Sequence, residues 1–70
     1  MSIGASIKEY IDEKGIKQAF LVEKAGISQY KVSNILNEKR EIKVTEYYLI
    51  CKALEVPFDK FIKQAEQQTA

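Results

Sequence analysis

Amide and hydroxyl side chains are spaced along residues 28–37 so that a helix would gather them on one face. At about 100° per residue, that face would carry Gln29, Tyr30, Ser33, Asn34 and Asn37. An amide offers both a donor and an acceptor, so it can pair with a base edge, adenine in particular. Such a face also occurs on helices that bind no ligand. The candidates for base contact are Gln29, Tyr30, Ser33 and Asn34.

Basic side chains follow this polar face, at the point where a chain lying in a groove would leave it. Lys39, Arg40 and Lys43 could contact phosphates there. The N–H groups beside Ser28, where the helix would begin, could face another phosphate. Basic residues in a loop are often only solvated, so the pattern alone leaves both interpretations open. The candidates for phosphate contact in this segment are Ser28, Lys31, Asn37, Lys39, Arg40 and Lys43.

The distribution of charge favours an anionic partner for the middle of the chain. The net charge of the 70 residues is only +1. Residues 17–43, however, carry six basic and three acidic residues, a net +3, against −2 for the rest. A basic middle between more acidic ends can steer a polyanion to one face, although the signal is weak by itself.

The composition argues against catalysis and against metal or cofactor chemistry. There is no histidine and one cysteine, so neither a zinc site nor a Cys-His or Ser-His nucleophile can be assembled. A chain of this length has little room for a substrate cleft, so we expect no small-molecule ligand. No apolar run approaches the roughly 20 residues of a membrane span, and the N-terminus is unlike a signal peptide. We therefore expect a cytoplasmic protein that is not an enzyme.

The apolar residues recur at spacings of three and four, which predicts an all-α fold. Gly15 and Gly26 are expected to end helices, and Ser28 is a good N-cap. Pro57 is well placed to open the last helix. The predicted helices cover about 3–14, 17–25, 28–37, 44–55 and 57–66, in one domain of residues 1–66 with a frayed tail at 67–70.

The inner side of each predicted helix is an apolar stripe, and Cys51 is expected to be a buried apolar residue within one of them. These stripes would pack together in a single small core. The inward residues are Ile3, Ile7, Tyr10 and Ile11; Leu21, Val22 and Ala25; Val32, Ile35 and Leu36; Val44, Tyr47, Ile50, Cys51 and Leu54; and Phe58, Phe61, Ile62 and Ala65.

The second and third helices would be joined only through Gly26 and Ile27, a connection short enough to make a helix–turn–helix corner. With this corner, residues 7–62 resemble the Cro/repressor (XRE) helix-turn-helix family. The matching segments are "GIKQAFLVEKAGISQYKVSNILN" and "ALEVPFDKFI". The resemblance implies a compact, lambda-repressor-like domain of five helices, whose third helix enters the major groove. It also implies that Gln18, which opens the second helix, lies near a phosphate.

Some positions depart from the pattern of the family. Val22 stands where alanine is usual, Phe20 where a charged residue is usual, and Glu38 where glycine is frequent. Many relatives pair an arginine of the first helix with a glutamate at the end of the third, and those positions are Ile11 and Leu36 here. We expect an apolar contact in place of that ion pair.

The leading hypothesis is a sequence-specific transcriptional regulator, a prophage-like repressor that binds double-stranded DNA. By the resemblance it would be a homodimer, and we expect Phe58 and Ile62 at the interface. The alternative is the same fold used as a protein-binding module, such as an antirepressor or an antitoxin-like partner, with an apolar patch near Phe20 or Phe58.

Overall fold

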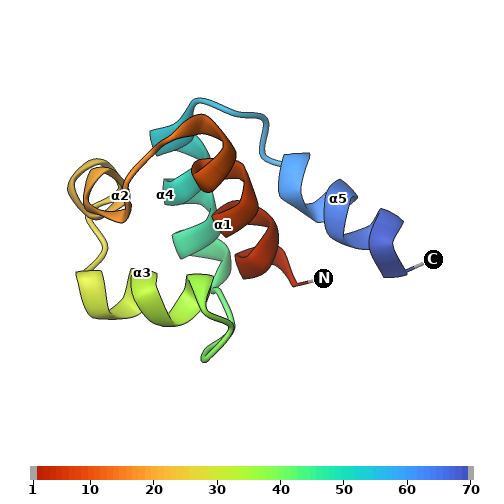
Figure 1. Ribbon diagram of the computed structural model, residues 1–70, viewed down its shortest axis with the longest axis horizontal. Helices are drawn as coiled ribbons and strands as arrows, with labels where there is room; N and C mark the ends of the chain where they lie inside the picture. Colours follow the sequence, from red (N-terminus) through yellow and green to blue (C-terminus); the bar gives the residue numbers. More distant parts are fainter. Residues whose placement is uncertain (1, 70) are drawn as a thin grey trace.

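The computed structural model describes residues 2–69, and the side chains of residues 2–64. Within them the chain forms helices and no strand, which confirms the predicted all-α class. Figure 1 labels the helices in chain order. They are α1 (Ile3–Lys14), α2 (Gln18–Ala25), α3 (Gln29–Leu36), α4 (Val44–Leu54) and α5 (Lys60–Thr69).

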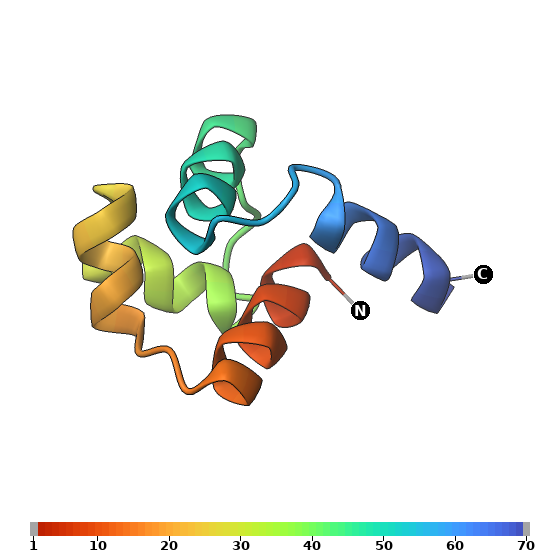
Figure 2. The same ribbon diagram turned by 90° about the horizontal axis from the view of Figure 1, so that it is seen from above.

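Four helices form the body of the molecule, and α5 extends from it. α4 packs against α2, while α1 packs against both α3 and α5. Figure 2 shows α5 reaching away from the other helices, beside the N-terminal end of α1. The molecule measures 34 × 24 × 23 Å. No helix in residues 2–69 is both long and apolar enough to cross a membrane.

Local capping sets the helix boundaries close to those expected. Gly15 and Gly26 end α1 and α2 at φ 70°, a left-handed conformation that glycine adopts without strain. The Ser28 hydroxyl accepts from the Lys31 N–H at 3.3 Å and so caps α3, as predicted. Lys17 makes no capping bond with its side chain at the start of α2.

The start of α5 differs from the prediction. The helix begins at Lys60 and not at Pro57, because Phe58 and Asp59 form a turn. The Tyr47 hydroxyl donates to the Phe58 carbonyl, which is therefore taken up by α4 instead of by a first helical turn. Burial, with Cys51 beside the phenol, raises the pKa of Tyr47 to about 12. The predicted tail at 67–70 overlaps the end of α5 and Ala70, and its fraying stays a prediction.

The core contains most of the predicted inner stripes. Ile11 and Leu36 are both buried in the same core cluster, as expected for an apolar contact in place of an ion pair. Cys51 is also buried, and burial raises the pKa of its thiol. The other buried apolar residues are Ile7, Leu21, Ala25, Ile27, Val32, Ile35, Tyr47, Ile50 and Phe61.

Two predicted core positions were wrong. Val44 is exposed, because it is the first residue of α4 and precedes the turns that other helices cover. Phe58 is about half exposed, since it lies in the turn before α5 and only one side of its ring meets Tyr47. Tyr10, Val22, Leu54 and Ile62 are partly buried at the edge of the core. The Ala65 side chain lies outside the described ones.

The backbones of α1 and α3 come very close at Gly4. A Cβ atom at this position would collide with the carbonyl oxygen of Ile35. The absence of a side chain therefore lets α1 support the back of α3, opposite its polar face. No local pattern predicts this contact, because Gly4 and Ile35 are 31 positions apart in the sequence.

Candidate nucleic-acid interface

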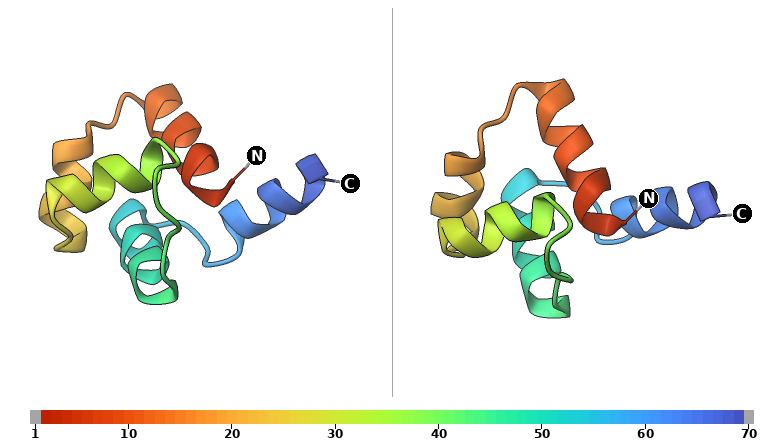
Figure 3. Two further views of the ribbon diagram at one scale, coloured as in Figure 1. Left: turned by 90° about the horizontal axis from the view of Figure 1, so that it is seen from below. Right: turned by 60° about the horizontal axis from the view of Figure 1, so that its bottom comes forward.

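The corner between α2 and α3 is held from inside and capped from outside. Ile27 is buried and anchors the connection to the core. Gly26 donates its N–H to the Val22 carbonyl at 3.1 Å, and Ser28 then starts the next helix. α3 lies along the lower edge of the molecule in Figure 1 and along the near face when viewed from below in Figure 3.

The polar face of α3 is presented outward. Gln29 and Tyr30 are exposed, with 77% of Tyr30 accessible, while Ser33 and Asn34 are partly exposed. Val32, Ile35 and Leu36 fill the opposite side, which is buried. The separation of the two faces therefore matches the sequence-based expectation, and the four candidate base contacts share one accessible side of the helix.

A short chain of hydrogen bonds ties one edge of this face to α1. The side-chain Nδ2 of Asn37 donates to the Ser33 hydroxyl at 3.3 Å, and the Lys8 ammonium donates to Oδ1 of Asn37 at 3.4 Å. Lys8 thus adds a cation at the end of α3, which sequence reasoning missed. No local pattern could have found it, since Lys8 and Asn37 are 29 positions apart.

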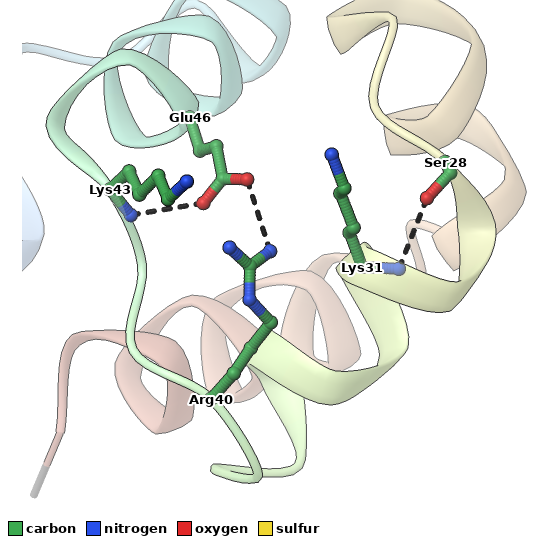
Figure 4. A network of polar contacts seen from close by, with 5 residues as sticks. All are labelled: Ser28, Lys31, Arg40, Lys43 and Glu46. Atoms are coloured by element: carbon green, nitrogen blue, oxygen red, sulfur yellow. Dashed lines mark hydrogen bonds and ion pairs between the residues drawn. The ribbon is translucent and has the colours of Figure 1, made fainter.

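The basic residues of α3 and of the loop after it fall into two groups. Lys31, Lys39 and Lys43 have exposed side chains. Arg40 instead reaches across to α4, where its Nη1 lies 3.0 Å from Oε2 of Glu46 (Figure 4). Sequence reasoning did not include Glu46, although a glutamate three residues after the N-cap, here Lys43, is a known capping signal. Only the lysines of this loop therefore have charges that are free of such a pair.

The loop of residues 37–43 has a fixed backbone at both ends. The N–H groups of Lys39 and Arg40 both donate to the Asn34 carbonyl, at 2.8 and 3.3 Å. Glu38 reaches this arrangement at φ 60°, a left-handed conformation that favours glycine. At the other end the Lys43 N–H donates to Oε1 of Glu46 at 3.0 Å. The loop lies on the same side of the molecule as α3 (Figure 3).

Gln18 is the first residue of α2 and is partly buried. The first N–H groups of a helix carry partial positive charge and favour an anion, and Lys17 does not cap them with its side chain. This position is compatible with the phosphate contact that the resemblance implies.

Two apolar surfaces lie outside this polar region. Phe20 is 39% exposed and lines a groove of about 620 Å³ formed by the α1–α2 connection, α2 and the end of α4. Phe58 and Ile62 line a smaller groove of about 170 Å³ together with Ile42 and Val44. The end of α4 lies at the top of Figure 1, and α3 lies at the bottom.

A sequence model of the helix-turn-helix family matches residues 7–61, which is most of the chain. The protein therefore belongs to this family, in the Cro/repressor (XRE) group that the sequence resembles. It is a DNA-binding regulator of the helix-turn-helix type. No curated protein shows significant similarity to the chain.

Proposed function

We propose that the protein is a sequence-specific transcriptional repressor that reads the major groove with the outer face of α3. The observation that carries this proposal is the exposed, uncharged polar face beside an exposed set of lysines. Gln29 and Asn34 would pair with base edges, Tyr30 would stack or contact a thymine methyl group, and Ser33 would contribute a hydroxyl. Repression would follow from occupation of the DNA, and no catalytic step is involved.

Phosphate contacts would hold α3 in the groove from both sides. Gln18 and the first N–H groups of α2 would bind one backbone strand, with Ser28 near it. Lys39 and Lys43 would bind the phosphates beyond the other end of α3, near Asn37, and Lys31 would bind a phosphate nearer Ser28, in the first turn of the helix. These contacts would supply affinity that depends on salt and little on sequence. The expected cytoplasmic location follows from this role.

A homodimer would fit the proposed role, because a twofold axis lets two copies of α3 read related half-sites about one helical turn apart. The apolar groove beside Phe58 and Ile62 supports an interface there. Sedimentation over a range of concentrations, together with binding to single and paired half-sites, tests this. A monomer that binds paired half-sites without cooperativity would contradict it.

The central proposal is tested by selecting bound duplexes from a random pool. We expect one enriched motif, whose binding weakens steeply with salt. The Gln29→Ala/Asn34→Ala double variant should lose the motif and keep general affinity for duplex DNA. A pool with no enrichment, combined with binding that does not respond to salt, would contradict the proposal.

A second candidate function is a protein-binding module that uses the groove beside Phe20. The observation that favours it is the large exposed ring in an apolar groove on the side away from α3. This reading predicts little response to DNA, and it predicts that Phe20→Ser changes partner capture without changing the fold. If the DNA selection succeeds and Phe20→Ser has no effect on regulation, this candidate is eliminated.

A further inference from the structure

Arg40 is the one cation of the loop after α3 whose charge is already engaged. Its side chain is 26% exposed and that of Glu46 is 12% exposed. The other ion pair in the described residues, Lys63 with Asp59, has side chains that are 69% and 55% exposed. An exposed pair contributes little, but a shielded pair is costly to break because one charge is left without a partner. For Arg40 to bind a phosphate, its ion pair with Glu46 would first have to break, which is not required of Lys39 or Lys43.

Glu46 bonds to both Arg40 and Lys43, which lie at either end of the second half of the loop. One carboxylate oxygen accepts from the Arg40 guanidinium and the other accepts from the Lys43 backbone N–H, each at 3.0 Å. Burial acts to raise the pKa of Glu46, but the Lys43 N–H and the Arg40 charge outweigh it, and the pKa is lowered. The carboxylate is therefore ionised at neutral pH and acts as a brace between residue 40 and the start of α4.

The first half of the loop is held separately, by the Asn34 carbonyl of α3. The backbone around Lys39 is thus fixed to the recognition helix, and the backbone at Lys43 is fixed to α4. The Arg40–Glu46 pair joins these two fixed points. In Figure 4 the Arg40 side chain spans the space between the loop and α4.

We propose that Arg40 is a positioning residue, which acts on DNA through Glu46 by fixing the loop that presents Lys39 and Lys43. Sequence reasoning grouped Arg40 with the phosphate contacts, and its geometry assigns it a different role. This inference rests on the proposed DNA-binding function. It also predicts the order of the loop in the absence of DNA, which can be measured independently.

The test is a double-mutant cycle on DNA affinity with Arg40→Gln, Glu46→Gln and the combined variant. We expect each single change to weaken binding to a selected site about threefold to tenfold. The double variant should bind at least as tightly as the single variant with the lower affinity, because both single changes break the same ion pair. The salt slope should stay nearly constant in all three. In contrast, Lys43→Gln should reduce the slope by about one unit.

Two further variants separate positioning from charge. Glu41→Gln removes an exposed acid of the same loop and should tighten binding slightly, whereas Glu46→Gln should weaken it. Arg40→Lys retains a cation that can reach the carboxylate, and we expect it to recover part of the affinity lost in Arg40→Gln. If Glu46→Gln instead tightens binding and increases the salt slope, Arg40 is a phosphate contact that Glu46 restrains, and the proposal is overturned.

Amide hydrogen exchange of residues 39–43 in the free protein tests the fixation of the loop separately from DNA binding. The proposal predicts faster exchange in Arg40→Gln and Glu46→Gln than in Glu41→Gln, with unchanged exchange at Ile50 in the core. If the native protein fails to bind DNA but the exchange result holds, the proposed function fails while the brace remains. Unchanged loop exchange in both variants would overturn the brace itself.

Discussion

The outer face of α3 and the loop that follows it lie on the same side of the molecule but carry different kinds of side chain. The helix exposes amides, hydroxyls and a phenol, with Lys31 at one edge. The loop has five charged residues among its seven: Glu38, Lys39, Arg40, Glu41 and Lys43. Uncharged donors and acceptors discriminate between base edges, while charges respond to the phosphate backbone whatever its sequence. The comparison suggests that specificity and general affinity reside in separate, adjoining parts of the protein.

The largest expected effect comes from a core substitution that would destabilise both α3 and the loop after it. Leu36 is buried at the end of α3, next to the start of the loop, so Leu36→Ala should lower the free energy of unfolding by ~2–5 kcal/mol. Denaturant titration measures this, and DNA binding should fall in proportion to the folded fraction. Glu13→Ala, at an exposed position of α1 that is not a candidate DNA contact, serves as the control. A loss well below 2 kcal/mol would mean that α3 does not depend on the core beneath it.

The next effect concerns the helix face alone. Gln29→Ala and Asn34→Ala should each reduce discrimination at particular base pairs by ~1–3 kcal/mol, because each removes a paired amide. The measurement is affinity for the selected site and for its single-base variants. Thermal unfolding of the variants should match the native protein, since both side chains are on the accessible face. Equal weakening toward every duplex would show that the face does not read bases.

A smaller effect concerns the backbone conformation and the charge of the loop. Glu38 has φ 60°, so Glu38→Gly should stabilise the fold by ~1 kcal/mol and, by removing a negative charge, should also tighten DNA binding. Glu55→Gly at φ 56° should give a similar gain in stability with no change in DNA affinity, because it ends α4 at the far side. Glu41→Gly has no positive φ to relieve and should destabilise. The result would be contradicted by equal changes at all three sites.

The smallest effect depends on pH. The pKa of Glu46 is lowered from 4.5 by the Lys43 N–H and Arg40, against the opposing effect of burial. A lowered folded-state pKa contributes stability that is present above the ordinary value and is lost as the pH falls through the folded value. Stability should therefore decline more below pH 4.5 in the native protein than in Glu46→Gln. Parallel denaturant titrations measure the difference, and identical acid profiles would contradict the pairing.

Most of the fold could be predicted because local sequence patterns determine most of its helices and turns. Apolar spacing marked α1 to α4, and Gly26 with Ser28 marked the corner that positions α3. Local patterns failed where distant residues decide the structure. The Tyr47 hydroxyl bonds to the Phe58 carbonyl just before α5, and Gly4 of α1 meets the backbone carbonyl of Ile35 in α3.

The candidate interface likewise contains residues that local patterns could place and residues that only tertiary packing places. Helical periodicity was sufficient to place Gln29, Tyr30 and Asn34 on one accessible face. The sequence could not show that Arg40 is paired, because a basic residue in a loop has the same pattern whether it faces solvent or a carboxylate. Lys8 was missed for a related reason, since it reaches the end of α3 only through the packing of α1.

The salt dependence of binding, measured side by side for Asn34→Ala and Lys43→Ala, tests the division between helix and loop most directly. Both variants are titrated on the selected site and on an unrelated duplex at several salt concentrations. We predict that Asn34→Ala loses affinity only for the selected site and retains the native salt slope. Lys43→Ala should weaken binding to both duplexes alike and reduce the slope by about one unit. The same change of specificity and of salt slope in both variants would contradict the division between helix and loop.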